Sequence, residues 1–364
     1  MRILQIINSL ETGGAERLAL SLHGKYLQRG HDSCILALAG EVPDAAVDGV
    51  YGLSSVTPYD PFMPMRLLDL SGDADPAGFD VVHAHLFPCQ LWTALLKETA
   101  GLEGVLVTTE HSTSNRRRGR HVWKPLEAWF YRRYDAVVCV SGAAAHELRE
   151  WLPELAGSIE VIHNGIELEE FAISQRRRKR SGTTVLSVGR LTEAKNYIVA
   201  LEAFARVKKN LGPGLSYVIA GGGPLEDSLR EHACRLGIGE SVEFLGDVRD
   251  VASLMEESDL FFMPSSREGF GIAALEAMAA GLPVVASDLR GISEVVGSDG
   301  ECGLLADPTS PEDLAAAMER LLCDTGLVME MRSAARKRAE QFSLDRTADG
   351  YLDLFDRTLA REAE

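Results

Sequence analysis

With 364 residues, the chain is longer than a single hydrophobic core usually supports, so two domains of similar size are expected. Its composition, 46% hydrophobic and 25% charged, is that of a soluble globular protein, and no apolar stretch approaches the roughly 20 residues of a membrane-spanning helix. A formal net charge of −17 argues against general affinity for nucleic acids, and six scattered cysteines without metal-like or disulfide-framework spacing fit reduced thiols in the cytosol.

Apolar runs alternate with segments of helical periodicity along the chain, a pattern typical of parallel sheets with helices on both faces. The charged stretch 174–182, which lacks apolar residues, suits a linker between two such α/β domains, residues 1–173 and 183–342. From Ser343 onward, apolar residues recur on one face of a predicted helix. Strands are predicted near residues 2–8, 33–39, 81–84, 104–109, 136–140 and 159–162, and then near 184–189, 215–220, 241–244, 259–263, 283–286 and 303–305.

Gly13 and Gly14 follow the first predicted strand and precede a helix, so main-chain N–H groups there can approach a phosphate. A tight structural turn is the alternative interpretation. Glu16 and Arg17 then fall in the first helical turn. We expect Arg17 to point toward an anionic acceptor or into the cleft that two facing α/β domains form beyond the carboxyl ends of their strands.

His83 and His85 share one face of a predicted strand and suggest a metal pair. No third ligand lies at a helpful spacing, so we predict no metal site. His85 is interpreted instead as an acceptor-side or structural histidine.

Residues 116–133 hold seven basic residues against one acidic residue, Glu127, with four aromatic residues interleaved. In an acidic protein, this run favours contact with an anionic bilayer surface or a lipid pyrophosphate, because each cation near such a surface contributes about 1 kcal/mol. A structural amphipathic helix and a nucleic-acid contact are the alternatives.

Glu268 and Glu276 bracket a Gly-rich run that predicts a loop opening a helix. A helix N-terminus offers unpaired N–H groups and the positive end of a dipole, and Gly269 and Gly271 let a ligand approach the main chain closely. Because carboxylates accept hydrogen bonds from sugar hydroxyls, a ligand with both a sugar and a phosphate would explain the pattern. Two solvated glutamates on a helix are the alternative.

Nine motifs are distributed along nearly the whole chain. They are Gly13-Gly14-Ala15-Glu16-Arg17, Thr108-Thr109-Glu110-His111, Val140-Ser141, Val161-Ile162-His163-Asn164-Gly165, Val188-Gly189-Arg190 with Lys195, Gly221-Gly222-Gly223-Pro224, Phe244-Leu245-Gly246, Pro264-Ser265 and the run from Glu268 to Glu276. Jointly, they make the chain resemble a retaining glycosyltransferase of family 4 with the GT-B architecture, in which two Rossmann-like domains face a central cleft. The resemblance implies sugar transfer from a nucleotide-sugar donor with retained anomeric configuration, no metal or other cofactor, and a last helix, within residues 343–364, that crosses back onto the first domain.

The resemblance also assigns roles. Arg190 and Lys195 would neutralise the leaving diphosphate, and His111 would reach the donor sugar near the reacting carbon. The resemblance implies reaction on one face of the sugar, with the leaving phosphate oxygen taking the acceptor's proton. The two-carboxylate scheme of glycoside hydrolases is the rival route to retention, and no residue is an obvious covalent nucleophile for it. Donor-binding residues would be Gly13, Gly14, Gly222, Phe270, Gly271 and Ile272, with Glu276 on the ribose and Glu268 on the transferred sugar, while Arg17, His85, Glu110, Arg116, Arg117 and Arg118 would lie on the acceptor side.

The expected activity is synthesis of a cell-surface polysaccharide, a glycolipid or a lipid-linked oligosaccharide, in the cytoplasm or at the inner face of the plasma membrane. A uridine nucleotide is favoured as the donor base. Two alternatives stay open: a nucleotide-sugar epimerase or phosphorylase on the same fold, and a non-catalytic nucleotide-sugar-binding membrane scaffold. Intact His111, Arg190, Lys195 and Glu268 argue against the scaffold.

Overall fold

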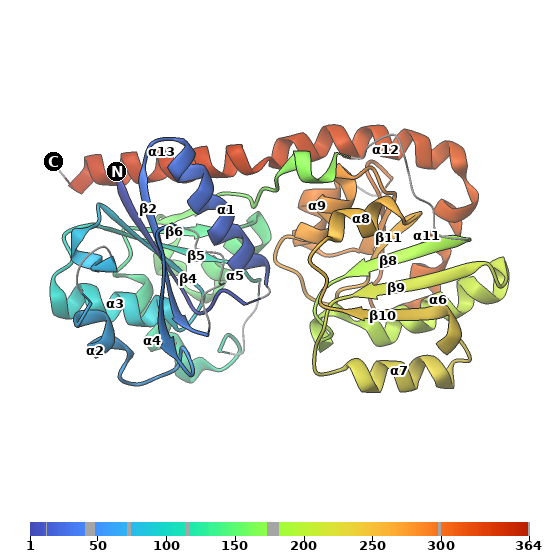
Figure 1. Ribbon diagram of the computed structural model, residues 1–364, viewed down its shortest axis with the longest axis horizontal. Helices are drawn as coiled ribbons and strands as arrows, with labels where there is room; N and C mark the ends of the chain where they lie inside the picture. The colour runs from blue at the N-terminus through green and yellow to red at the C-terminus, as the bar shows by residue number, and fades with distance from the viewer. Residues whose placement is uncertain are drawn as a thin grey trace. The chain divides into compact units, whose positions relative to one another are not determined.

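The computed structural model describes residues 1–11, 13–40, 48–70, 74–113, 117–172, 182–297 and 300–362. The chain divides into two compact units, of which the first comprises Met1–Gly165 with Leu344–Glu364 and the second Ile166–Ser343 (Figure 1). Each unit is built around a parallel sheet, as the alternation of apolar runs and helical segments predicts.

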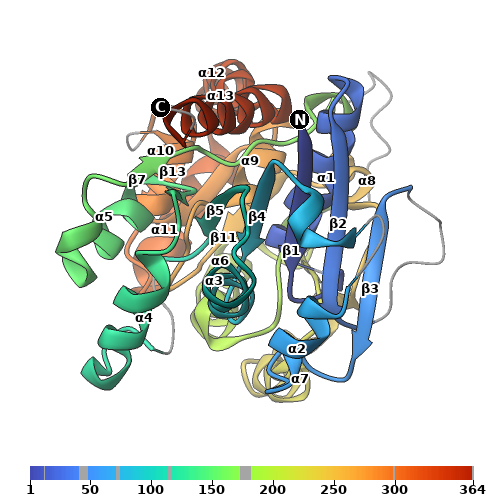
Figure 2. The same ribbon diagram turned by 90° about the vertical axis from the view of Figure 1, so that its left-hand side faces the viewer.

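The described part of the first unit holds a seven-stranded sheet in the order β3-β2-β1-β4-β5-β6-β7, and Figure 2 shows these strands from the side of this unit. The order reverses between β1 and β4, which is the doubly wound pattern of a Rossmann-like domain. The strands are β1 (Arg2–Ile7), β2 (Asp32–Ala39), β3 (Val50–Ser55), β4 (Val81–His85), β5 (Val105–Glu110), β6 (Ala136–Cys139) and β7 (Ile159–Val161), and the helices are α1 (Gly14–Gln28), α2 (Met63–Leu68), α3 (Cys89–Ala100), α4 (Lys124–Tyr131), α5 (Gly142–Trp151) and α13 (Leu344–Glu362).

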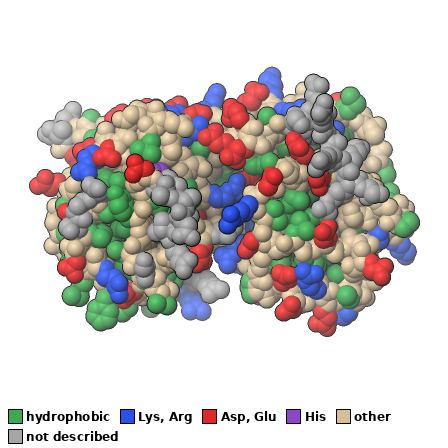
Figure 3. Space-filling view, viewed as in Figure 1, with side chains coloured by type: hydrophobic (Ala, Val, Ile, Leu, Met, Phe, Trp, Pro, Cys, Tyr) green, Lys and Arg blue, Asp and Glu red, His purple; other side chains and the backbone are tan. Residues whose placement is uncertain are grey.

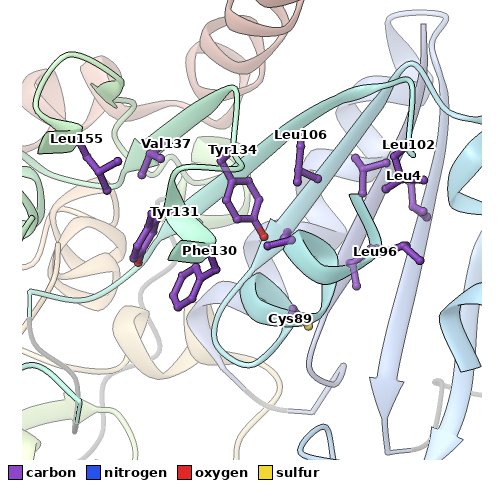
Figure 4. Close-up of a cluster of buried hydrophobic side chains, with 14 of the residues drawn as sticks. Leu4, Cys89, Leu96, Leu102, Leu106, Phe130, Tyr131, Tyr134, Val137 and Leu155 are labelled. Atoms are coloured by element: carbon purple, nitrogen blue, oxygen red, sulfur yellow. The ribbon is translucent and has the colours of Figure 1, made fainter. Parts of the chain in front are cut away.

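Side chains of this sheet alternate between two helical layers, as the period of two in a strand requires. Leu4 and Leu106 contribute to the larger core beneath α2, α3, α4 and α5, where Leu96 and Phe130 converge on the sheet (Figure 4). The neighbouring strand residues pack on the opposite face, against α1 and α13. Odd-numbered residues of β1, β4 and β5 therefore share the face that α13 covers.

Helix α13 belongs to the first unit, where it packs against α1 and β5. Tyr351 and Phe355 are fully buried, the Tyr351 hydroxyl lies 2.9 Å from Thr109 Oγ1, and the Phe355 ring centroid lies 6.1 Å from that of Tyr26. Ion pairs from Lys25 and Arg29 of α1 to Asp345 and Asp349 flank this contact. The predicted return of the last helix to the first domain is confirmed.

The described part of the second unit holds a six-stranded sheet in the order β10-β9-β8-β11-β12-β13, which reverses between β8 and β11. Helices α6 and α11 pack side by side over one core, and α9 packs against α10 and α12. The strands are β8 (Thr183–Val188), β9 (Leu215–Ala220), β10 (Val242–Gly246), β11 (Leu260–Met263), β12 (Val284–Ser287) and β13 (Leu304–Ala306), and the helices are α6 (Tyr197–Leu211), α7 (Glu226–Arg235), α8 (Val251–Glu256), α9 (Ile272–Ala279), α10 (Arg290–Val296), α11 (Pro311–Cys323) and α12 (Thr325–Ala339).

Two details differ from the prediction. Strand β3 was not predicted, because its Val-Tyr-Gly-Leu-Ser-Ser sequence has no apolar run. The boundary lies at Gly165 rather than at residue 173, since the short 3₁₀ helix Leu168–Phe171 packs against α9 of the second unit. The predicted linker 174–182 lies outside the described residues except for Gly182.

Candidate functional site

Both sheets place polar and charged residues where the strand order reverses. In the first unit, Gln5, His85 and His111 lie on or directly after β1, β4 and β5. In the second unit, Lys195 follows β8 and Glu268 follows β11, which are neighbours at the point of reversal. Because doubly wound sheets bind ligands outside the carboxyl ends of the strands at this point, each unit has its candidate site where topology predicts it.

Lys195 and Glu268 form the centre of the site in the second unit. The Lys195 ammonium lies 2.5 Å from Glu268 Oε2, and both side chains are mostly shielded, with 24% and 19% of their surface exposed. Two residues that are 73 positions apart in the sequence, and that were predicted separately, are therefore brought into one ion pair.

Backbone contacts fix this pair in place. Asn196 adopts a left-handed conformation with φ of 57°, which Asn tolerates, and begins α6. Its side-chain amide donates to the carbonyl oxygens of Pro264 and Pro308 at 3.1 and 2.8 Å, and the Ser266 N–H donates to the carbonyl of Ala194. The loop that carries Lys195 is thus tied to the loop that carries Glu268.

The entrance of α9 adjoins Glu268. Gly271 precedes the helix with φ of 94°, a conformation that favours glycine, and no side chain of the described residues caps this end. Phe270 is buried against Phe342, with ring centroids 5.6 Å apart, and Glu276 is buried in the helix. A side chain on Gly291 of α10 would approach the carbonyl oxygens of Gly269 and Glu268 to within 2.6 and 2.8 Å, so glycine allows α10 to pack directly on this loop.

Arg190 and Gly222 lie on neighbouring loops after β8 and β9. The Leu191 N–H donates to the Gly222 carbonyl, and the Gly222 N–H donates to Asp247 Oδ1 at 3.0 Å, so this N–H already has a partner in the structure. The Arg190 side chain is exposed and forms no hydrogen bond or ion pair with the described residues. Its guanidinium remains available to an anionic ligand.

In the first unit, Gly13 and Gly14 begin α1 as predicted, with Gly13 in extended backbone. The Glu16 carboxylate folds back over Gly13, so a phosphate at this helix entrance would have to displace it. Arg17 is exposed in the first turn. Ile272 is half-buried at the start of α9.

The histidines form a connected cluster on the face covered by α1 and α13. His85 Nδ1 lies 3.2 Å from His111 Nε2, and the ring centroids of His83 and His85 lie 4.0 Å apart with the rings tilted by 42°. Burial lowers the pKa of His83 to about 3 and that of His111 to about 4, and burial together with the neighbouring imidazoles lowers the pKa of His85 well below its usual value. All three imidazoles are therefore neutral near pH 7.

Glu110 and Arg118 are held inside the first unit. Even-numbered residues of β5 point toward α4, where Glu110 Oε2 accepts from Arg118 at 2.6 Å and from the Tyr131 hydroxyl at 2.7 Å. Arg118, Tyr131 and other neighbours outweigh burial and lower the pKa of the Glu110 carboxyl. The expectation that Glu110 faces an acceptor does not fit this geometry, because its carboxylate points into the interior.

Other cations of the predicted basic run also have partners. Arg117 pairs with the fully buried Glu127, and the Arg117 guanidinium lies over the Phe87 ring. Glu127 also accepts a hydrogen bond from the Trp151 indole. Arg132 and Arg133 pair with Glu154 and Glu98. The run therefore serves largely to hold residues 117–133 onto the unit, and Arg116 lies outside the described residues.

A cavity of about 620 Å³ opens at the carboxyl ends of β1, β2 and β3. Its lining mixes polar groups, including Ser9, Glu11 and Ser55, with the fully exposed Val56. Such a lining suits a hydroxylated ligand that has an apolar portion.

Sequence reasoning missed several residues that build these sites: Gln5, Tyr131, Asn196, Asp247 and Tyr351. Gln5 could have been found from the period of two in strands, because it lies on the same face of the sheet as the histidine pair of β4. Asn196 could have been found as a residue type that often begins a helix. Among the described residues, no group of three His, Cys, Asp or Glu side chains is placed to hold a metal ion, and none of the helices combines the length and apolar character needed to cross a bilayer.

The two doubly wound units define a GT-B protein, and solved structures of that class match the whole fold. Anabaena HepE, crystallised with UDP and glucose, aligns with a TM-score of 0.86 at 20% identity over 98% of this chain and 100% of its own. Sucrose-phosphate synthase from Thermosynechococcus elongatus aligns with a TM-score of 0.83 at 20% identity, over 99% and 100% of the two chains. The chain belongs to glycosyltransferase family 4, because the model for Glycosyltransferase Family 4 matches residues 12–170 and that for Glycosyl transferases group 1 matches residues 169–341.

Curated relatives agree with this assignment. Phosphatidyl-myo-inositol mannosyltransferase from Mycobacterium tuberculosis is 34% identical over 321 residues, which cover 84% of this chain and 81% of that protein. Glycogen synthase from the same species is 31% identical over 271 residues, or 71% of this chain. That second match spans only 64% of the glycogen synthase.

Proposed function

We propose that this protein is a retaining, metal-independent glycosyltransferase that moves a sugar from a nucleotide-sugar donor to a lipid-linked or glycan acceptor. The observation that carries the proposal is the Lys195–Glu268 pair at the entrance of α9, with the exposed Arg190 on the same loop as Lys195. A cationic group and open helix N–H groups suit a diphosphate, and a carboxylate beside them suits sugar hydroxyls.

The proposed donor site uses the second unit for the nucleotide and diphosphate. Arg190 and Lys195 would stabilise the negative charge that develops on the leaving diphosphate, while Gly271 and Ile272 at the α9 entrance offer main-chain N–H groups. Glu276 would accept from the ribose. HepE has been solved with UDP and with UDP-glucose, which supports a uridine nucleotide as the first donor to test.

The first unit would supply the acceptor site and His111. A neutral imidazole orients a sugar hydroxyl and need not act as a base, since the leaving phosphate oxygen can take the acceptor's proton when both lie on one face of the sugar. Gly13 and Gly14 would approach the donor phosphate after Glu16 moves aside. Gly222 stays a donor-binding hypothesis and Arg17 an acceptor-side hypothesis. His85 fits the structural alternative, because it is fully buried and both of its ring nitrogens have partners inside the unit.

Two assays test the proposal. A thermal-shift panel of nucleotide sugars should identify the donor, because a ligand at 100 times its Kd adds about 2.7 kcal/mol to stability. With that donor, free nucleotide diphosphate should appear in step with a glycosylated acceptor that keeps the donor's anomeric configuration, and a chelator should not slow the reaction. Conversion of the nucleotide sugar without an acceptor would identify an epimerase, and binding without turnover would identify a scaffold.

An amphiphilic acceptor is favoured by an exposed apolar surface, which we define as Val56, Tyr59, Phe62, Met65 and Leu68. These side chains are 47–102% exposed, and Figure 3 shows hydrophobic side chains gathered over α2 at the lower left. Met63 and Leu67 of α2 are buried, whereas Met65 and Leu68 point outward. The exposed Arg66 beside them pairs with Asp60, so the outward side combines apolar side chains with a cation, as membrane-surface helices do.

This surface adjoins the polar cavity through Val56, which lines both. A hydroxylated head group in the cavity with its apolar chain over α2 would match both linings. One relative acts, by its name, on phosphatidyl-myo-inositol, which is a lipid with a hydroxylated head group. We therefore propose a cytoplasmic protein that binds the inner face of the membrane through the apolar surface, with residues 116–133 contributing less than their charge count suggests.

Vesicle sedimentation tests the membrane proposal. With vesicles of phosphatidylcholine and phosphatidylglycerol, replacing both Phe62 and Met65 by serine is expected to weaken binding roughly 100-fold or more, because burying each such side chain contributes about 1.5–3 kcal/mol. Met329→Ser is the matched control, since Met329 of α12 is 72% exposed on the second unit. No binding of the unaltered protein at low salt, or an equal loss in the control, would contradict the proposal.

A further inference from the structure

A buried line of polar side chains crosses three neighbouring strands of the first unit and ends at His111. The Gln5 amide Nε2 donates to the Ala19 carbonyl of α1 at 3.0 Å, Gln5 Oε1 lies 3.2 Å from His85 Nε2, and His85 Nδ1 lies 3.2 Å from His111 Nε2. Gln5 and His85 are fully buried. Neither Gln5 nor the hydrogen bonds that connect it to His111 have a part in the proposed function.

The Ala19 carbonyl sets the direction of every bond in the line. A carbonyl can only accept, so the Gln5 NH₂ faces Ala19 and the Gln5 oxygen faces His85. That oxygen also can only accept, so His85 carries its proton on Nε2. A neutral His85 then has a lone pair on Nδ1, and the bond to His111 requires a proton on His111 Nε2.

We infer that Gln5 and His85 are positioning residues that hold His111 in its Nε2–H tautomer, so that His111 presents the lone pair of Nδ1 to the ligand. Among the described residues, the hydrogen bond to His85 is the only one recorded for the His111 ring. This inference rests on the proposed function for the part that His111 plays toward the sugar. It specifies that part: His111 accepts a hydrogen bond from a sugar hydroxyl and does not donate one to a phosphate or carbonyl oxygen.

The surroundings keep the line neutral. Burial lowers the pKa of both His85 and His111. The Glu110 carboxylate acts in the opposite direction on His111 but does not outweigh burial, and it points to the other face of the sheet, where Arg118 holds it. Tyr351 of α13 faces the neighbouring His83 and bonds to Thr109. Protonation of His85 would reverse the hydrogen bond between His85 and His111, because both nitrogens of His85 would then donate and His111 Nε2 would have to accept.

The test is nitrogen NMR of the full-length protein labelled at its histidine ring nitrogens, with the His111 signals assigned by their loss in His111→Gln. In the unaltered protein, His111 is expected to carry its proton on Nε2. Gln5→Glu keeps the size of the side chain but adds a negative charge beside His85 Nε2, which favours the imidazolium at His85. The His111 proton is then expected to move to Nδ1.

His23 is an internal control. Its Nε2 lies 2.9 Å from the Asp48 carbonyl, so it is also an Nε2–H tautomer and should stay so in every variant. His85→Leu removes the acceptor and should release His111 to a mixture of tautomers, with His23 showing that the unit remains folded. A proton on Nδ1 of His111 in the unaltered protein, or an unchanged tautomer in Gln5→Glu, would overturn the inference.

Kinetics separate this inference from the proposed function. Gln5→Glu is expected to lower kcat/KM for the donor roughly tenfold, the effect of one lost hydrogen bond to a sugar hydroxyl. If the tautomer switches as expected while kcat/KM is unchanged, the positioning by Gln5 and His85 stands, and the role of His111 toward the sugar fails. A loss of activity without a switch in tautomer would count against the positioning itself.

Discussion

Lys195→Ala is expected to lower kcat for sugar transfer by roughly 10²–10³, as loss of a group that stabilises a developing oxyanion typically does. The structure adds a second effect. Lys195 is the ion-pair partner of Glu268, so its removal leaves a mostly shielded carboxylate facing the proposed diphosphate position without a counter-charge. The measurement is release of nucleotide diphosphate under donor saturation.

The ion pair also makes the two positions non-additive. Glu268→Gln should weaken transfer by removing an acceptor for sugar hydroxyls, but it also removes the unpaired charge that Lys195→Ala leaves behind. The Lys195→Ala, Glu268→Gln double variant is therefore expected to lose less activity than the product of the two single losses, since residues in direct contact couple by about 0.5–3 kcal/mol.

Lys209→Ala is the matched control, because Lys209 is exposed on α6, away from the loops after β8 and β11. It should leave the rate unchanged. An unaltered kcat in Lys195→Ala would remove Lys195 from the proposed role, and full activity in Glu268→Gln would remove Glu268 from sugar binding. Strictly additive losses would show that the pair separates before the rate-limiting step.

The strands were predictable because the buried strands of a parallel sheet read as short apolar runs. The predicted strand 81–84 lies within β4, and 215–220 coincides with β9. Strand β3 lacks that signal because its Val-Tyr-Gly-Leu-Ser-Ser sequence is interrupted by Gly52 and ends in two serines. Its edge position is not the reason, since the other edge strands, β7, β10 and β13, overlap the predicted strands 159–162, 241–244 and 303–305.

The site was predictable only in parts. Lys195 and Glu268 were each recognised from a motif, but their contact requires β8 and β11 to be neighbours in the sheet. The strand order cannot be read from the local sequence around either residue. Gln5 lies 80 residues before His85 and shows no motif at all. Its role follows from register, since Gln5 is paired with His83 across β1 and β4.

The basic run shows why a charge count misleads. Residues 116–133 hold seven cations and one anion in sequence, yet the anions that pair with Arg118, Arg132 and Arg133 are Glu110, Glu154 and Glu98, which lie outside the run. The Arg118–Glu110 pair is shielded, and the Arg132 and Arg133 pairs lie at the surface, but in all three the cation has a partner within the unit. The apolar surface of α2 and the segment before it escaped prediction for the opposite reason, since apolar residues such as Phe62 and Met65 are expected in a core until their neighbours are known.

Acidification from pH 7 to pH 5 is expected to lower the free energy of unfolding of the first unit by several kcal/mol. His83 and His111 have pKa values of about 3 and about 4 in the folded state against 6.5 for a free imidazole, so between pH 6.5 and about 4 the unfolded state binds more protons. Stability therefore rises with pH across this window and falls on acidification, by roughly 2 kcal/mol for each of the two residues. His85, whose pKa is also lowered, acts in the same direction.

All four tryptophans of the chain, at positions 92, 123, 129 and 151, lie in the first unit, so tryptophan fluorescence follows its unfolding in urea without a signal from the second unit. His83→Leu should make the dependence on pH shallower by about one proton, because it removes one group that must be neutral in the folded state. If stability does not change between pH 7 and pH 5, the folded unit accommodates charged imidazoles at β4 and β5. The hydrogen bond between His85 and His111 would then be free to reverse its direction near physiological pH.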